Sequence, residues 1–323
     1  MFESVQIYPP PALVDIGNNT DNDPPVFEPV EMYRVKNAIV TPYGYIVKNF
    51  RLLTKAVSFR HRSVLTLKNI ALIVFFKKKV RVNQPVISIT QGWYDGYYHF
   101  TLESLPKLFL LKDYLEEAVL VFPKKTQQYH VEWLQLLGVR NILYLGDNEV
   151  AKTPLAITTS FPARDLNHHH IITPLFRSWV LSKISNKNSS GHQKIFIGRK
   201  KPRHRKLLNI SDVTNFLTGK GFVYIEMEDF TVEDQVKLFY NATEIICVHG
   251  AALSNICFSK PGTKVLDMIH EDFQQWCFLK LAKILDINYS LLKCSGNNAH
   301  PLPGYRDLEV NLQQLEERLN AWK

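Results

Sequence analysis

Short apolar runs alternate with amphipathic stretches along most of the chain, which is typical of an α/β protein. In the first half, the expected strands are residues 71–76, 85–90, 118–122, 141–145 and 155–160. Helical patterns at residues 98–115 and 131–137 lie between them. Because strands that alternate with helices favour parallel pairing, we expect a parallel sheet in this half.

The second half repeats a β-α unit more regularly. Its expected strands are residues 194–198, 222–226, 243–248 and 264–269, and its expected helices are residues 211–218, 231–241 and 273–285. Ser211 and Thr231 are residue types that cap the N-termini of helices. A β-α unit repeated in this way indicates a nucleotide-binding half of the doubly wound type.

Polar segments divide the chain into parts. Residues 1–35 are rich in Pro, Asn and Asp, and they are expected to form an irregular N-terminal arm. The polar stretch at residues 185–193 has no periodicity and is the expected boundary between an N-terminal domain, residues 36–185, and a C-terminal domain, residues 186–305. The tail, residues 306–323, contains an amphipathic helix that we expect to pack back across the first domain.

Composition limits the possible partners and compartments. The 323 residues are 46% hydrophobic, which is enough for two cores, and the net charge of +9 implies an acidic partner. We find no secretory signal and no apolar run that could span a bilayer, so a cytoplasmic protein is expected. The four cysteines are expected to be buried thiols. A domain cut from a longer lumenal precursor would show the same pattern.

The most informative segment is residues 248–255, which follows an apolar strand and opens a helix. The N-terminus of a helix offers free N–H groups to a phosphate. Gly250, Ala251 and Ala252 are small enough for a diphosphate to approach the backbone, and His249 could add a hydrogen bond. The alternative is that these small residues only allow tight packing of a strand against a helix.

The surroundings of this segment, residues 230–269, resemble glycosyltransferase family 61. Gln235 stands where that family has the Gln of an EQ-like helix, and Asp267 lies in a PGT-containing strand where the family more often has Glu. The resemblance implies a GT-B fold, in which two Rossmann-like domains face a cleft. It also implies that Asp267 faces the donor nucleoside, where a carboxylate can accept hydrogen bonds from ribose hydroxyls.

A basic run follows the first strand of the second half, and it loosely resembles the family's R-x-x-x-R-x-x-x-N pattern. Arg199 and Arg203 have the first spacing, and Arg205 and Asn209 have the second. We expect Arg199 and Arg205 to clamp a diphosphate and Asn209 to support the donor, although Arg203 could replace Arg205. Guanidinium groups chelate phosphate oxygens and neutralise charge on a leaving group. A solvated basic loop or a nucleic-acid patch is the alternative.

In the first half, residues 91–107 are rich in Gly and aromatic side chains, and they look like the family's YxHF-x-x-E-x-LP segment. His99 and Glu103 are four residues apart, so both project from one face of a helix. The resemblance places this segment on the acceptor side. Inversion requires a base, so we expect His99 to take the acceptor proton and Glu103 to orient it or to be the base itself. A buried structural pair is the alternative.

Four aromatic residues precede or flank His99. Trp93, Tyr94, Tyr97 and Tyr98 are the expected acceptor-binding residues, because aromatic faces pack against the apolar faces of sugar rings. Simple packing of a loop between a strand and a helix is the alternative for all four.

Metal binding is not expected. Three consecutive histidines at residues 168–170 rarely point at one ion, and we expect them in a loop of the interdomain cleft. Asp21 and Asp23 have the spacing of an Asp-x-Asp motif, but they belong to the expected irregular arm. We therefore expect a metal-independent transferase.

These patterns predict an inverting glycosyltransferase that moves a sugar from a nucleotide sugar, UDP-linked, to an acceptor hydroxyl in polysaccharide or glycan biosynthesis, with no other cofactor. The positive charge would suit a lipid-linked acceptor and a peripheral position at the inner face of a membrane. Nucleic acid is not an expected partner of such an enzyme. The rival interpretation is a non-enzymatic basic protein that binds nucleic acid or another polyanion.

Overall fold

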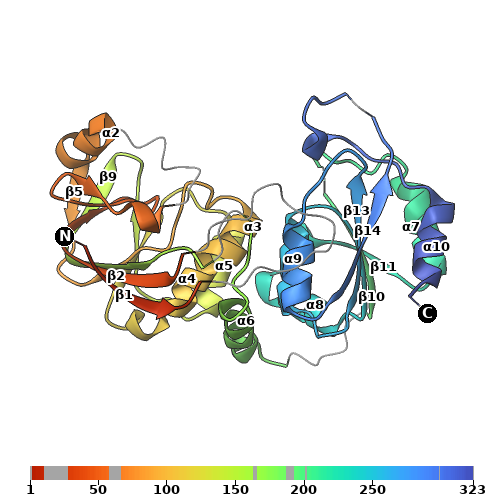
Figure 1. The fold of residues 1–323 in the computed structure, drawn as a ribbon, viewed down its shortest axis with the longest axis horizontal. Helices are drawn as coiled ribbons and strands as arrows, with labels where there is room; N and C mark the ends of the chain where they lie inside the picture. Colours follow the sequence, from red (N-terminus) through yellow and green to blue (C-terminus); the bar gives the residue numbers. More distant parts are fainter. Residues whose placement is uncertain are drawn as a thin grey trace. The chain divides into compact units, whose positions relative to one another are not determined.

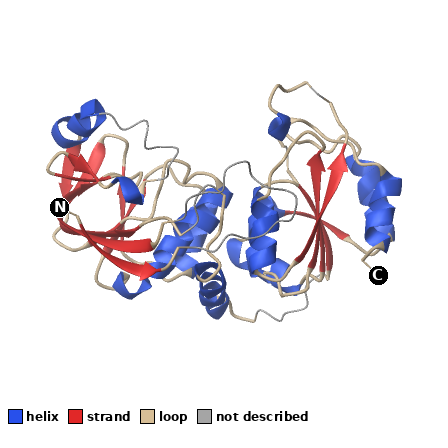
Figure 2. Ribbon diagram, in the orientation of Figure 1, coloured by secondary structure: helices blue, strands red, loops and turns tan. Residues whose placement is uncertain are grey.

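The computed structural model describes residues 2–10, 28–57, 67–162, 166–186, 193–200, 202–297 and 299–322. By their contacts, these residues form two compact units that divide between Lys183 and Ile184. Each unit contains one β-sheet with helices against it (Figures 1 and 2). No helix in the described ranges is both long enough and apolar enough to cross a bilayer.

The sheet of the first unit is mixed. Its antiparallel part contains β1 (Glu3–Tyr8), β2 (Val30–Val40), β3 (Ile46–Lys48) and β4 (Arg51–Leu52). Its parallel part contains β5 (Lys78–Arg81), β6 (Val86–Ile87), β7 (Val119–Pro123), β8 (Ile142–Leu145) and β9 (Glu149–Thr159). The two parts meet where β2 pairs antiparallel with β9. The prediction of a parallel sheet is confirmed only for the second of these parts.

Two predictions for the first unit are wrong. The expected irregular arm is wrong for residues 3–8 and 30–35, which form β1 and the start of β2, while residues 11–27 lie outside the described part. The expected strand at residues 71–76 is helical instead, because α2 (Leu67–Ala71) continues into a π-helical turn, Leu72–Phe76. A short apolar run does not distinguish a strand from a helix by its periodicity alone.

The predicted helices of the first unit are confirmed. The first is built from α3 (Tyr97–His99), a π-helical turn (Phe100–Ser104) and α4 (Leu105–Leu110), and the second is α5 (Gln128–Leu136). The unit ends with α6 (Ile172–Lys183), which contacts α4. These helices carry the histidine and carboxylate that the sequence singles out.

The second unit has a parallel sheet with the order β11-β10-β12-β13-β14. Its strands are β10 (Lys194–Gly198), β11 (Val223–Glu226), β12 (Glu244–Val248), β13 (Lys264–His270) and β14 (Asn288–Cys294). Its helices are α7 (Ile210–Gly219), α8 (Val232–Asn241), α9 (Cys277–Ile284) and α10 (Leu312–Asn320). Helices α8 and α9 lie on one face of the sheet, and α7 and α10 lie on the other (Figure 1). The chain therefore winds both ways from β10, and the winding reverses between β10 and β12.

The elements predicted for this half are confirmed, with β14 added. Thr231 caps α8 by accepting a hydrogen bond from the backbone N–H of Asp234, at 3.2 Å. The expected cap at Ser211 is wrong, because α7 already begins at Ile210 and Asn209 occupies the N-cap position.

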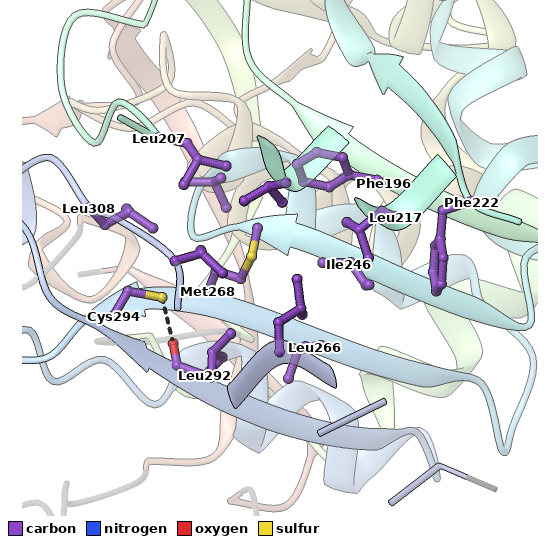
Figure 3. Packing of buried hydrophobic residues seen from close by; sticks show 14 residues of the cluster. Phe196, Leu207, Leu217, Phe222, Ile246, Leu266, Met268, Leu292, Cys294 and Leu308 are labelled. Atoms are coloured by element: carbon purple, nitrogen blue, oxygen red, sulfur yellow. Dashed lines mark hydrogen bonds between the residues drawn. The ribbon is translucent and has the colours of Figure 1, made fainter. Parts of the chain in front are cut away.

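The C-terminal helix belongs to the core of the second unit. Leu315 of α10 is completely buried and belongs to the same hydrophobic cluster as Val213 and Leu217 of α7. Figure 3 shows Leu217 of this cluster together with side chains that the sheet presents on that face. Those sheet residues are Phe196, Ile246, Val248, Leu266, Met268, Leu292 and Cys294. The expectation that this helix packs across the first domain is wrong, because the apolar face of the helix covers its own sheet.

Candidate functional site

The carboxyl ends of two parallel strands in the second sheet bring the basic run and the small-residue segment together. Strand β10 ends at Gly198 and leads into Arg199, and its parallel neighbour β12 ends at Val248 and leads into His249 and Gly250. A Cβ atom added to Gly250 would lie 3.8 Å from Nε of Arg199, so these two residues adjoin. Open α/β sheets bind ligands beyond the carboxyl ends of their strands where the winding reverses, and both residues lie there.

Backbone N–H groups are available at the same place. Ala251 is exposed and Ala252 half-buried at the start of a 3-10 helix, Ala251–Phe258, whose N-cap Gly250 makes no side-chain cap. The first N–H groups of a helix have no partners within the helix. This start is therefore suited to an anionic ligand, as the sequence predicts for these small residues.

Arg205, rather than Arg203, joins this group. Arg203 is exposed, whereas Arg205 is half-buried and its Nε has no hydrogen-bond partner among the described residues. Burial and the positive charge of Arg199 lower the pKa of Arg205, and the negative charge of Asp267 raises it, which places Arg205 near both. Its φ of 56° is uncommon for a residue other than glycine. Backbone strain beside an unpaired guanidinium nitrogen is typical of a functional position.

A buried carboxylate holds His249. Oδ2 of Asp267 lies 2.6 Å from Nδ1 of His249 and also accepts a hydrogen bond from the hydroxyl of Tyr289. With the proton on Nδ1, Nε2 of His249 is the ring atom left for a ligand. Asp267 is fully buried inside β13, ahead of the end of that strand. Asp267 thus supports His249 through Oδ2, while its Oδ1 has no hydrogen-bond partner among the described residues. The contact of Asp267 with the donor nucleoside stays a prediction.

Gln235 uses both ends of its amide inside the protein. Its Nε2 donates to the carbonyls of Met227 and Phe230 at 3.0 and 3.1 Å, and its Oε1 accepts from Nδ2 of Asn255 at 3.1 Å. Asn255 is completely buried in the 3-10 helix that starts at Ala251. Gln235 therefore positions the helical segment of the site, and its contact with the donor stays a prediction.

Asn209 likewise has an internal position. Its Nδ2 donates to the carbonyl of Val310 at 2.9 Å, and its Oδ1 accepts from the N–H of Val310 at 3.0 Å. The side chain thus fixes the C-terminal segment to the start of α7, and its support of the donor stays a prediction.

We expect the Asn209→Ala variant to lose about 1–3 kcal/mol of unfolding free energy, because both backbone groups of Val310 lose their partner. Urea unfolding measures this loss. Nucleotide affinity should stay unchanged in the folded variant, and a weaker affinity there would instead support the role at the donor.

In the first unit, His99 and Glu103 contact each other as their spacing predicts. Nδ1 of His99 lies 2.9 Å from Oε2 of Glu103, which is buried and also accepts a hydrogen bond from the amide of Gln91. The imidazole is 24% exposed, so it is oriented from inside and accessible from outside. A Cβ atom added to Gly96 would lie 3.2 Å from the imidazole, which explains a small residue there.

The four aromatic candidates divide into two pairs. Tyr94 and Tyr98 are buried, and their hydroxyls are bound to a backbone carbonyl at 2.8 Å and to a histidine at 3.1 Å. Packing accounts for the positions of Tyr94 and Tyr98, and their place at the acceptor stays a prediction. Trp93 and Tyr97 are half-buried, and the ring centre of Trp93 lies 5.0 Å from that of His99. These two stay candidates for the acceptor site.

The three consecutive histidines have separate contacts within the first unit. His168 bonds to the hydroxyl of Tyr98, Nε2 of His169 lies 2.9 Å from the carbonyl oxygen of Pro9, and His170 stacks on His169. In the described part of the chain, no three His, Cys, Asp or Glu side chains gather as metal ligands would.

A comparison with known proteins matches one family to both the His99 segment of the first unit and the basic run of the second. The family model for glycosyltransferase 61 matches residues 97–266, more than half of the chain, from α3 into β13. The chain belongs to the glycosyltransferase 61 family. The match includes the His99 segment, the basic run and the segment that follows β12.

Two curated relatives carry glycosyltransferase names. A β-1,2-xylosyltransferase of Arabidopsis thaliana is 31% identical over 71 residues, which is 22% of this chain and 13% of the relative. Protein O-linked-mannose β-1,4-N-acetylglucosaminyltransferase 2 of Mus musculus is 26% identical over 192 residues, 55% of this chain and 29% of the relative. The aligned part thus spans less than a third of either relative.

Three residues of this glycosyltransferase 61 chain were missed by the sequence analysis. Tyr289 lies on β14, a strand without a clear apolar run, and Asn255 carried no signal beyond its place near Gly250. Lys107 follows Glu103 by one helical turn, and a lysine on a helix is normally solvated.

Lys107 is nonetheless completely buried. Its Nζ has no hydrogen-bond partner among the described residues and lies 4.3 Å from the ring centre of Phe161. Burial lowers the pKa of Lys107 to about 7, because the charged ammonium is poorly solvated there.

The free energy of unfolding should therefore depend on pH through Lys107. Because the pKa is lower in the folded state, the unfolded state binds more protons between about pH 7 and pH 10, so stability rises with pH there, by up to about 1.4 kcal/mol per unit. The Lys107→Met variant should lose this slope. Urea unfolding across this pH window tests it, and equal slopes in both proteins would contradict the lowered pKa of Lys107.

Proposed function

We propose that this chain is an inverting glycosyltransferase that transfers a sugar from a nucleotide sugar to an acceptor hydroxyl. The observation that carries the proposal is the convergence of Arg199, Arg205 and Gly250 at the point where the second sheet reverses its winding. Membership of the glycosyltransferase 61 family supports sugar transfer as the reaction. We place the two units in a GT-B arrangement, with the donor held by the second.

In this proposal the leaving diphosphate is stabilised by the protein. Arg199, Arg205 and the N–H groups that follow Gly250 bind its oxygens, and Nε2 of His249 adds a contact. As the bond between the anomeric carbon and the phosphate oxygen breaks, fixed positive charge meets the charge that develops. These groups would neutralise the charge on the diphosphate as a divalent cation does in other transferases, so we propose that transfer does not require a metal ion.

The acceptor is activated in the first unit. His99, oriented by Glu103, takes the proton of the acceptor hydroxyl while its oxygen bonds to the anomeric carbon. Attack on the face opposite the leaving diphosphate inverts the configuration. We propose a UDP-linked donor, and a glycan or lipid-linked acceptor in polysaccharide or glycan biosynthesis at the inner face of a membrane.

The geometry of the basic run favours this proposal over a polyanion-binding protein. Lys200 pairs with Asp229, Arg199 donates to the carbonyl of His204 at 3.0 Å, and Arg205 is half-buried. Binding to a nucleic-acid backbone requires cations that share one solvated face. Lys200 is held in an ion pair, and Arg199 and Arg205 lie at the carboxyl end of the sheet. Only Arg203 and Lys206 are therefore left as exposed, unpaired cations of the described run.

A thermal-shift screen against UDP-, GDP- and CMP-linked sugars, with and without chelator, tests the proposal. We expect saturable stabilisation by one nucleotide class, unchanged by chelator. No stabilisation by any nucleotide sugar, together with steeply salt-dependent binding of generic RNA, would instead identify a polyanion-binding protein.

A further inference from the structure

The π-helical turn Leu72–Phe76, which follows α2, is apolar on both sides. Ile70 and Ile73 pack inward against the sheet, while Leu72, Phe75 and Phe76 are 42%, 62% and 78% exposed. A helical segment that is apolar all round is normally enclosed by protein or by lipid. In the described chain, nothing covers the outer side of this one enough to bury it.

A strained hairpin adds a fourth apolar side chain at the same place. Asn49 and Phe50, between β3 and β4, have φ values of 48° and 59°, and the ring of Phe50 lies 5.3 Å from that of Phe75, centre to centre. Glycine and asparagine are the usual residues in this conformation, and a bulky aromatic is an outlier. Phe50 is still 50% exposed, so burial does not offset the conformational cost.

Positive charge is concentrated around these side chains, which we call the apolar patch (Phe50, Leu72, Phe75 and Phe76). Residues 32–94 contain twelve Lys and Arg residues but no Asp or Glu, whereas the whole chain has a net charge of +9. Lys48 and Arg51 flank the hairpin tip, Lys68 lies on α2, and three lysines at residues 77–79 directly follow Phe76. The segment that contains the patch is thus strongly basic in sequence, although one of its lysines, Lys78, pairs with Glu149.

We propose that the apolar patch is a membrane-docking surface, in which Phe50, Leu72, Phe75 and Phe76 insert into the interfacial region of a bilayer. The surrounding Lys and Arg side chains bind the head groups of anionic lipids. This inference goes beyond the transfer reaction and does not rest on it, because every residue in the patch lies outside the proposed catalytic and donor-binding groups.

The charge pattern decides against the other occupants. A second copy of the chain would place one basic rim against another, and the repulsion between like charges opposes such a dimer. A nucleic acid would use the cations but would leave Leu72 and Phe76 without an apolar environment. An anionic bilayer is complementary both to the rim and to the patch.

Sedimentation of the full chain with vesicles tests this assignment. We expect binding to phosphatidylcholine vesicles that contain about 30% phosphatidylserine, little binding to phosphatidylcholine alone, and weaker binding as salt rises. The double variant Phe75→Ser and Phe76→Ser should bind at least about 10-fold more weakly. The matched control replaces Val5 and Leu302, which are 63% and 56% exposed elsewhere, by serine and should bind like the unmodified chain.

Three further readouts separate the occupants. A double variant that binds vesicles as well as the control would overturn the assignment, as would equal binding to neutral and anionic vesicles. Light scattering that shows a dimer lost only in the double variant would identify a second copy, and an equal loss of RNA binding would identify a nucleic acid. Stabilisation by nucleotide sugars should persist in the double variant, so a failure of docking and a failure of the proposed transfer remain distinguishable.

Discussion

Replacing Arg199 by alanine is expected to lower kcat/KM by about 10²–10³-fold and to weaken nucleoside diphosphate binding. The guanidinium lies against Gly250 at the end of β12, and its Nη1 already donates a hydrogen bond to the carbonyl of His204 at 3.0 Å. A side chain that is fixed before the donor arrives loses little entropy on binding, so its removal should cost most of the interaction. Isothermal titration with the nucleoside diphosphate and steady-state turnover measure the two effects.

Lys200 provides the matched control, because Lys200→Ala removes the same charge from the adjacent position. Lys200 pairs with Asp229 and its side chain is 50% exposed, so we expect kcat/KM and nucleoside diphosphate affinity to change by less than about 3-fold. The loss of kcat/KM in Arg199→Lys should lie between the losses in Arg199→Ala and Lys200→Ala. Lysine keeps the positive charge but lacks the planar guanidinium that binds two phosphate oxygens at once. Equal losses in the Arg199 and Lys200 variants would mean that only net charge matters, and the clamp would be abandoned.

The elements of the second unit were predictable because apolar runs and turn residues mark each of them. Residues 194–198 and 243–248 are apolar runs that become strands buried on both faces. Strand β14 was missed because it is an edge strand whose side chains are mostly half-buried, so it shows no continuous apolar run. Predictions of this kind therefore find the centre of a parallel sheet more easily than its edge.

The first unit was harder to predict because local composition and tertiary context disagree. The strand β2 buries Val35, Ala38 and Val40, but the polar segment before it masks its alternation. Residues 71–76 have the composition of a strand, yet only one side of the segment faces the core, as a helix on a sheet requires. Which side of an apolar run meets the core is a tertiary property.

The same limit applies within the site. The contact between His99 and Glu103 follows from spacing on one helix, and the place of Arg199 beside Gly250 follows from two adjacent strand ends. The internal bonds of Asn209 and Asp267 do not follow from spacing, because their partners are distant in the sequence or lie on an unpredicted strand. A motif thus indicates where polar groups gather, and only the structure shows which of them already have partners.

Replacing His99 by alanine is expected to lower kcat by about 10²–10⁴-fold and to change donor affinity by less than about 2-fold. His99 lies in the first unit, whereas the residues that we assign to the diphosphate lie in the second, so loss of the base should leave donor binding intact. Glu103→Gln should have a smaller effect, because the amide keeps a hydrogen-bonding partner for Nδ1 but loses the negative charge that favours the protonated imidazole. Rapid-quench turnover and donor titration separate the two parameters.

The control is His170→Ala, which removes a half-buried imidazole of the same unit that stacks on His169. Its kcat should stay within about 3-fold of the unmodified chain, because no step of the proposed transfer uses it. If turnover persisted in both the His99→Ala and the Glu103→Ala variants, neither side chain would be the base. The hydroxyl proton would then have to leave by another route, and the short contact between these two residues would be a structural pair at the start of a helix.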